Sequence, residues 1–137
     1  MKKILVVDDD PNIVTALTVR LQAAGYEVSS APDSFKGLQA AITSPPDLIL
    51  LDVWMPAVIG FAVAQRLQEL GLDWIPVIFI TASKKEGLRA AAKDVGAAGY
   101  LEKPYEPEEL LALIAQVLRE SERAAPGRKS APRQPVD

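Results

Sequence analysis

The stretch Ile4-Leu5-Val6-Val7-Asp8-Asp9-Asp10 joins a fully apolar run to three consecutive aspartates. A run that is apolar at every position is typical of a strand covered on both faces, as in a parallel sheet between helices. Two further runs have this form, Leu48-Ile49-Leu50-Leu51 before Asp52 and Val77-Ile78-Phe79-Ile80 before Thr81. We therefore predict three central parallel strands whose polar ends meet at one edge of the sheet, where open α/β sheets bind ligands.

Capping and stop signals predict five helices that alternate with the strands. The first helix is predicted to start at Asp10-Pro11 and to end at Gly25, and the second to start at Asp33 and to end at Pro45. The third runs from about Gly60 to Leu70 and ends at Gly71, and the fourth starts at the capping box Ser83-Lys84-Lys85-Glu86 and ends near Gly96. The fifth starts at Pro107. In the second helix the spacing predicts that Phe35, Leu38 and Ile42 face inward. The fourth helix has the smallest apolar face, so we expect it to bury the least.

Two weaker strand patterns fix the order of the sheet. Residues 26–30 alternate between apolar and polar, and residues 99–101 form a short run, so both are predicted at the edges. With right-handed crossovers the strand order becomes 2-1-3-4-5. The expected fold is a flavodoxin-like, doubly wound α/β domain, with a five-stranded parallel sheet and five helices over residues 1–121. Its topological switch point lies between the strands that end at Val7 and Leu51.

Composition excludes several kinds of chemistry. The 137 residues include no cysteine and no histidine, which rules out disulfides, thiol nucleophiles, imidazole bases and Cys/His zinc sites. No apolar run approaches the roughly 20 residues that span a bilayer, and Asp8 follows Met1 too closely for a signal peptide, so we expect a cytoplasmic domain with no membrane contact.

The charge is unevenly distributed along the chain. Residues 123–137 carry +3 of a net charge of −3, which leaves −6 on the remainder. An acidic body argues against direct nucleic-acid binding by this domain. Residues 122–137 are basic and rich in proline without an apolar period, so we expect a disordered tail or a linker remnant.

The clustered carboxylates need a compensating cation. Two unit charges about 4 Å apart repel by about 4 kcal/mol at an effective dielectric near 20. Mg²⁺, which prefers oxygen ligands, and Lys103, which follows the fifth strand, are the available compensators. A cation-loaded acidic pocket with an ammonium and a hydroxyl suits a transferring phosphoryl group, and a carboxylate is the available nucleophile.

Each of these residues also has a simple structural interpretation. Asp10 suits a helix N-cap, Asp8, Asp9 and Asp52 suit loops or turns, Thr81 suits the end of a strand, and Lys103 suits a solvated surface. Their joint occurrence at one sheet edge favours a functional site.

The sequence resembles the receiver domain of two-component response regulators over residues 1 to about 121. The motifs are residues 4–10, Asp47-Leu48-Ile49-Leu50-Leu51-Asp52 with Met55-Pro56 and Gly60, Pro76-Val77-Ile78-Phe79-Ile80-Thr81-Ala82, and Gly99-Tyr100-Leu101-Glu102-Lys103-Pro104. Together, in this order and spacing, the motifs are highly specific. The chain departs from the family at Ala57-Val58-Ile59, where members often carry an acidic residue just before the glycine.

The resemblance implies a role for each site residue. Asp52 would accept a phosphoryl group from a phosphohistidine of a sensor histidine kinase or phosphotransfer protein. Asp9 would bind Mg²⁺ directly and Asp8 through water, with Asp52 and the backbone carbonyl of Trp54 as further ligands. In the modified state Thr81 and Lys103 would hold phosphoryl oxygens, Tyr100 would be the switch aromatic, and the peptide bond before Pro104 would be cis.

The resemblance also implies an output surface, formed by the fourth helix, the fifth strand and the fifth helix. A downstream effector is expected there, and a phosphorylation-dependent dimer is a further expectation. The domain would act as a phospho-acceptor signalling module with slow autodephosphorylation, not as an enzyme. Two alternatives stay open: an aspartate-based phosphohydrolase that uses Asp8 and Asp10, and a receiver-like interaction module that is not phosphorylated.

Overall fold

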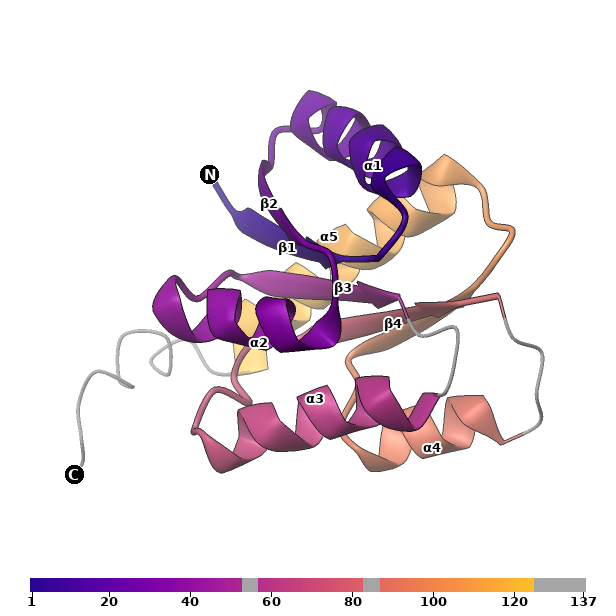
Figure 1. The fold of residues 1–137 in the computed structure, drawn as a ribbon. Helices are drawn as coiled ribbons and strands as arrows, with labels where there is room; N and C mark the ends of the chain where they lie inside the picture. Colours follow the sequence, from indigo (N-terminus) through magenta and orange to yellow (C-terminus); the bar gives the residue numbers. More distant parts are fainter. Residues whose placement is uncertain (53–56, 83–86, 125–137) are drawn as a thin grey trace.

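The computed structural model describes residues 1–52, 57–82 and 87–124 of the chain. Strands and helices alternate along it throughout (Figure 1). They are β1 (Lys3–Val7), α1 (Pro11–Ala23), β2 (Glu27–Ala31), α2 (Ser34–Thr43), β3 (Leu48–Asp52), α3 (Ala57–Glu69), β4 (Val77–Thr81), α4 (Leu88–Asp94), β5 (Gly99–Glu102) and α5 (Pro107–Ala124). Within the described residues, no helix is both long enough and apolar enough to cross a membrane.

The five strands form one sheet in the order β2-β1-β3-β4-β5, and all of its pairs are parallel. This order confirms the predicted fold. The fully apolar strands β1, β3 and β4 occupy the centre, because each is covered by helices on both faces. The alternating strand β2 and the short strand β5 form the edges, as expected.

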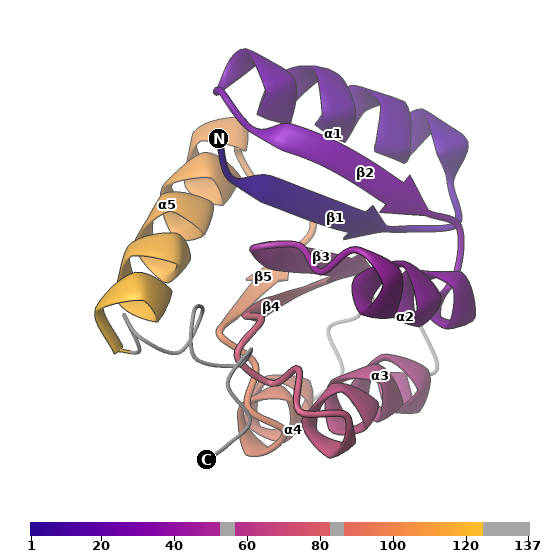
Figure 2. The same cartoon turned by 90° about the vertical axis from the view of Figure 1, so that its left-hand side faces the viewer.

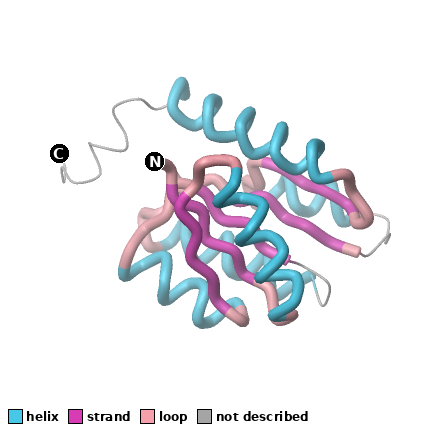
Figure 3. The backbone as a smooth tube through the Cα atoms, turned by 90° about the horizontal axis from the view of Figure 1, so that it is seen from above, coloured by secondary structure: helices cyan, strands magenta, loops and turns pink. Residues whose placement is uncertain are grey.

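Helices cover both faces of the sheet (Figure 3). Helices α1 and α5 lie on one face, and α2, α3 and α4 lie on the other (Figure 2). Alternation along each strand separates the two cores: Val6 and Leu50 pack with α1 and α5, whereas Leu5 and Leu51 pack with the other three helices. Each central strand therefore contributes side chains to both cores.

Predicted signals mark several helix ends. The Asp10 side chain accepts a hydrogen bond from the Asn12 backbone N–H at 2.9 Å, with Pro11 at the first position of α1. Asp33 caps α2 in the same way. Helix α5 begins at Pro107 and buries Leu110, Ile114, Val117 and Leu118, so it is the firmly packed helix that its pattern predicted.

The predicted inward face of α2 is wrong at two of its three positions, whereas the third, Leu38, is half-buried and packs against the core as expected. Phe35 is 69% exposed and Ile42 is 50% exposed, whereas Gly37 and Ala41 are buried. A Cβ added to Gly37 would lie 2.8 Å from a methyl group of Val7. The helix approaches the sheet most closely at Gly37, where a side chain would not fit, and Phe35 and Ile42 point away from the sheet.

Three element ends differ from the sequence expectation. Helix α3 begins at Ala57, three residues before the predicted start. Helix α4 begins at Leu88 with Gly87 as its N-cap, and the capping box at 83–86 lies outside the described residues. Helix α5 continues to Ala124, so residues 122–124 are helical and not part of the tail. Residues 125–137 also lie outside the described residues.

Helix α4 buries little of its surface, as predicted. Ala92 is the buried residue of its seven, and the apolar residues Leu88 and Ala91 are half-buried. Each other helix contributes two or more buried residues within the described part of the chain. Helix α4 is therefore the least firmly anchored of the five.

Candidate functional site

The candidate site lies at the carboxyl ends of the central strands. Asp8 and Asp9 directly follow β1, and Asp52 is the last residue of β3. Strands β1 and β3 are neighbours, and Val7 pairs with Leu51. The chain leaves β1 towards β2 on one side and leaves β3 towards β4 on the other, so this is the switch point of the sheet, where a ligand crevice forms.

The structure brings the three carboxylates together. One carboxylate oxygen from each of Asp8, Asp9 and Asp52 lies within 4.8 Å of the other two. Asp8 is 6% exposed, and Asp9 is on the surface. At such a separation, two unit charges repel by about 3 kcal/mol at an effective dielectric near 20. The fold holds this group together against that repulsion.

Lys103 supplies a positive charge to the group. Its Nζ lies 3.1 Å from Asp52 Oδ1, and only a quarter of the lysine side chain is exposed. The residue directly follows β5, and its backbone N–H donates to the Thr81 carbonyl at 2.8 Å, which extends the pairing of β4 and β5. The Lys103–Pro104 peptide bond is cis, the geometry that the resemblance implied.

The pKa of the Asp8 carboxyl is raised above its ordinary value of 3.8. Burial is the largest cause, and the charges of Asp52 and Asp9 act in the same direction. A hydrogen bond from the Asp10 backbone N–H, 2.9 Å from Asp8 Oδ1, and the charge of Lys103 oppose the shift. An unliganded Asp8 is therefore strained electrostatically, and a cation at the cluster would relieve it.

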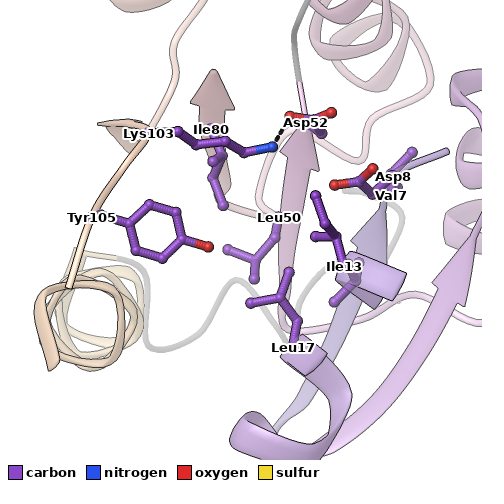
Figure 4. A pocket seen from close by; sticks show the side chains of 10 residues that line it. Val7, Asp8, Ile13, Leu17, Leu50, Asp52, Ile80, Lys103 and Tyr105 are labelled. Atoms are coloured by element: carbon purple, nitrogen blue, oxygen red, sulfur yellow. Dashed lines mark hydrogen bonds and ion pairs between the residues drawn. The ribbon is translucent and has the colours of Figure 1, made fainter. Parts of the chain in front are cut away.

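A small pocket lies below the ion pair of Lys103 and Asp52, on the α1 and α5 side of the sheet (Figure 4). Its other labelled lining residues are Val7, Asp8, Ile13, Leu17, Leu50, Ile80 and Tyr105. The Tyr105 hydroxyl points into this pocket. Burial is the main reason that the pKa of Tyr105 is raised, so this phenol is neutral at physiological pH.

Sequence reasoning did not identify Tyr105 as a pocket residue. The available signal was its closeness in sequence to Lys103, but the chain bends at residues 103–104, where the peptide bond is cis, so strand alternation does not fix the side on which Tyr105 lies. Proline at position 104 also interrupts the strand pattern.

Thr81 and Tyr100 lie on the opposite face of the sheet from the pocket. Tyr100 pairs with Phe79, and Glu102 pairs with Thr81. Phe79 and Tyr100 belong to the core beneath α2, α3 and α4, and Thr81 shares that face because it lies two residues after Phe79. Thr81 is fully buried. The structure therefore places Thr81 at the same sheet edge as the acidic cluster, with its side chain on the face that α2, α3 and α4 cover.

The acidic cluster has the donor chemistry of a site for a hard divalent cation. Three carboxylates offer oxygen ligands, which Mg²⁺ and Ca²⁺ prefer. Asp10 is not one of this group, because its side chain caps α1. Trp54, the expected backbone ligand, lies outside the described residues.

Residues 4–115 match the family model of the response regulator receiver domain. The chain therefore belongs to this family of signalling modules, whose fold the five-stranded sheet with its 2-1-3-4-5 order reproduces. Among solved structures, a CheY-like receiver domain protein from Methanospirillum hungatei has a TM-score of 0.83 at 29% identity, over 90% of this chain and 98% of that one. Chemotaxis protein CheY4 of Vibrio cholerae has a TM-score of 0.77 at 35% identity, over 85% and 98%.

Two similar full-length proteins are named as transcriptional regulatory proteins. The chain is 42% identical over 125 residues to the alkaline phosphatase synthesis transcriptional regulatory protein PhoP of Bacillus subtilis, covering 91% of this chain and 52% of that protein. It is 40% identical over 133 residues to the phosphate regulon transcriptional regulatory protein PhoB of Pseudomonas aeruginosa, covering 96% and 56%. The chain thus spans about half the length of these relatives.

Proposed function

We propose that Asp52 accepts a phosphoryl group from a phosphohistidine of a sensor kinase or phosphotransfer protein. The observation that carries this proposal is the cluster of Asp8, Asp9 and Asp52 with Lys103 3.1 Å from Asp52. Asp52 is the member of the cluster that directly contacts a cation of the chain. Its carboxylate is therefore positioned beside the charge that a phosphoryl group requires.

The transfer needs no general base. An oxygen of the Asp52 carboxylate attacks phosphorus while the N–P bond breaks, and its electron pair stays on the imidazole nitrogen, which takes up a proton from water. The carboxylate is already ionised for this step. Lys103 then moves from the carboxylate to a phosphoryl oxygen, a short displacement because it is already within hydrogen-bond distance of Asp52.

In this proposal Asp8, Asp9 and Asp52 hold Mg²⁺, together with the backbone carbonyl of Trp54. Such an ion, when bound, would neutralise charge on the carboxylates and on the transferring phosphoryl oxygens. Asp8 gains most from this arrangement, since its charge is disfavoured by burial and by its neighbours. The acidic cluster thus binds the cation, and the cation would reduce the repulsion between Asp52 and an anionic phosphoryl donor.

The donor protein is proposed to approach along the α1 side. A groove between α1 and the start of α5 adjoins the pocket and shares Ile13, Leu17, Lys103 and Tyr105 with it. Ala16, Arg20, Pro104, Pro107 and Leu110 complete its lining. A partner helix seated in this groove would bring its phosphohistidine close to Asp52, because the groove opens beside the Lys103 side chain.

The output surface is proposed to be formed by α4, β5 and α5. A phosphoryl group adds up to about two negative charges and strong hydrogen-bond acceptors. It would draw the Thr81 hydroxyl towards Asp52, leaving space for the Tyr100 ring on the same face of the sheet. Helix α4, with one buried residue, would move at the least cost. A downstream effector or a second copy would bind this surface, in the cytoplasm.

Intact-mass spectrometry tests the phosphoryl transfer. The protein is incubated with acetyl phosphate and Mg²⁺, and we expect a labile adduct of about 80 Da, one phosphoryl group. Asp52→Ala should abolish the adduct, and chelation of the metal should greatly reduce it. Asp73→Ala, an exposed aspartate outside the cluster, serves as the matched control and should be labelled as the wild type is.

The same assay separates the alternatives. A labelled Asp52→Ala variant would refute Asp52 as the acceptor. Absence of any adduct in the wild type would favour an interaction module that is not phosphorylated. Turnover of a generic phosphate ester would favour a phosphohydrolase, although the use of Asp10 as a helix cap argues against its proposed role in such an enzyme.

A further inference from the structure

One contact on the α4 side of the sheet is not used in the phosphoryl transfer proposed above. The guanidinium carbon of Arg89 lies 4.6 Å from the centre of the Tyr100 ring, within the range of a cation–π interaction. Arg89 is an exposed residue in the first turn of α4, and Tyr100 is a half-buried residue of β5. The contact therefore joins the least anchored helix to an edge strand.

Among the residues that the structure describes, the ring of Tyr100 is the interaction partner found for Arg89, which forms no ion pair with them. The pKa of Tyr100 is raised, mainly by burial and further by the charge of Glu102, while the charge of Arg89 opposes the shift. The ring is therefore a neutral phenol, the form in which its π face attracts a cation.

We propose that Arg89 is a positioning residue that holds the Tyr100 ring in its half-exposed place and thereby opposes the switch. This inference rests on the proposed function, in which the ring moves inward when Asp52 is modified. Inward movement would carry the ring away from the guanidinium and break the contact. A cation–π interaction at an exposed site is equivalent to about a two- to fivefold change in an equilibrium constant.

We call the contact between Arg89 and the Tyr100 ring the latch. Its loss should change the affinity for a phosphoryl analogue in the opposite direction to the loss of a positive charge elsewhere. Beryllofluoride, an anionic phosphoryl analogue, would bind the Asp52 carboxylate with Mg²⁺. Removing any positive charge from this acidic domain should weaken the binding of an anion through loss of long-range attraction. Loss of the latch should instead strengthen binding, because less of the binding energy is used to displace the ring.

The test measures the affinity for beryllofluoride by isothermal titration in excess Mg²⁺. Arg89→Met keeps the length of the side chain and removes its charge, and Arg89→Lys keeps a cation. Arg66→Met is the matched control, since Arg66 is an exposed arginine of α3 that pairs with Glu69 at 3.0 Å and is not paired with an aromatic ring. In parallel, ¹⁹F spectra of protein containing 3-fluorotyrosine report the Tyr100 ring, with Tyr100→Phe used to assign its signal.

We expect Arg89→Met to lower the apparent Kd about two- to fivefold and to shift the Tyr100 signal in the unmodified protein. Arg89→Lys should restore values close to those of the wild type, and Arg66→Met should leave the ring signal unchanged. An unchanged or raised Kd in Arg89→Met, with normal wild-type binding, would overturn the latch alone. Failure of the wild type to bind beryllofluoride would overturn the proposed function, and the latch with it.

Discussion

Asp8 is a buried carboxyl close to two other aspartates, so its ionisation opposes folding. Its folded pKa is raised above the ordinary 3.8, mainly by burial. Below the pKa of the unfolded state Asp8 is protonated in both states and does not lower the stability of the fold. As the pH rises through the pKa of the folded state, Asp8 ionises in the folded protein, and the fold loses stability. At neutral pH and without metal, the ionised Asp8 therefore destabilises the fold.

We predict that Asp8→Asn stabilises the metal-free protein by about 1–2 kcal/mol at pH 7. The amide removes a repelled charge, and its oxygen can still accept from the Asp10 backbone N–H. The gain should disappear well below pH 3.8, where Asp8 is protonated in both the folded and the unfolded state. Urea denaturation of both proteins across this pH range measures the difference, and a gain that is independent of pH would contradict the assignment.

The identity of the acidic residues was readable from the sequence because each directly follows an apolar strand. Their separation was not readable, since it depends on loop geometry after β1. The orientation of Thr81 was also not stated in advance, although its spacing from Phe79 fixes its face once the sheet is known. Tyr105 was missed because a proline separates it from the strand that carries Lys103.

At the scale of an element, α2 depends on the absence of a side chain at one position. A Cβ at Gly37 would lie 2.8 Å from Cγ2 and 3.2 Å from Cγ1 of Val7, a stiff β-branched residue in the core. Alanine favours a helix over glycine by about 1 kcal/mol, but an overpacked core costs about 1–3 kcal/mol. The second effect is the larger one.

We therefore predict that Gly37→Ala lowers the free energy of unfolding by about 1 kcal/mol, measured by urea denaturation. Combining it with Val7→Ala provides the control. In that background the added methyl group has space, so Gly37→Ala should become neutral or stabilising. If Gly37→Ala destabilises both backgrounds equally, close packing against Val7 is not the cause.

The errors in the sequence prediction of α2 have the same origin. Hydrophobic spacing selects the largest apolar residues as the inward face, and it predicted Phe35, Leu38 and Ile42, of which Leu38 alone packs against the core. A close helix-to-sheet approach selects the smallest residues instead, and the buried positions are Gly37 and Ala41. The strands were predicted correctly because full burial leaves an apolar run that does not depend on packing distance.

Helix α4 should respond most to modification, because its contribution to the core is one buried residue, Ala92. We predict that beryllofluoride with Mg²⁺ changes amide hydrogen exchange in Leu88–Asp94 and Gly99–Glu102 more than in the firmly packed α1. Hydrogen exchange with mass spectrometry gives the comparison. Unchanged exchange in both segments, under conditions where the ligand is bound, would exclude α4 and β5 from the response.

For the whole molecule, metal binding and folding should be coupled. The unfolded chain does not hold Asp8, Asp9 and Asp52 within 4.8 Å of one another, so a cation binds mainly the folded state. At a concentration 100 times its Kd, such a ligand stabilises the fold by about 2.7 kcal/mol. We predict that Mg²⁺ raises Tm in a concentration-dependent way, measured by calorimetry.

Substitution of Asp9, the exposed aspartate of the cluster, tests whether Mg²⁺ raises Tm by binding at the cluster. Asp9→Asn should lose most of the Mg²⁺-dependent rise in Tm, since it removes a charged ligand from the cluster. Asp73→Asn removes the same charge from an exposed position and should keep the rise. Equal rises in all three proteins would show that the ion acts by general screening and not at the cluster.

The acceptor pocket lies on one face of the sheet, and Thr81 and Tyr100 lie on the other. Tyr100 and Lys103 are three positions apart, and their side chains lie on opposite faces. That spacing is an odd number, so the length of this segment is constrained more strictly than its composition. Leu101 and Glu102 could be exchanged for similar residues with little change of geometry. Insertion of a single residue between them would leave Tyr100 in place, turn Lys103 towards the opposite face, and so remove the ammonium from Asp52.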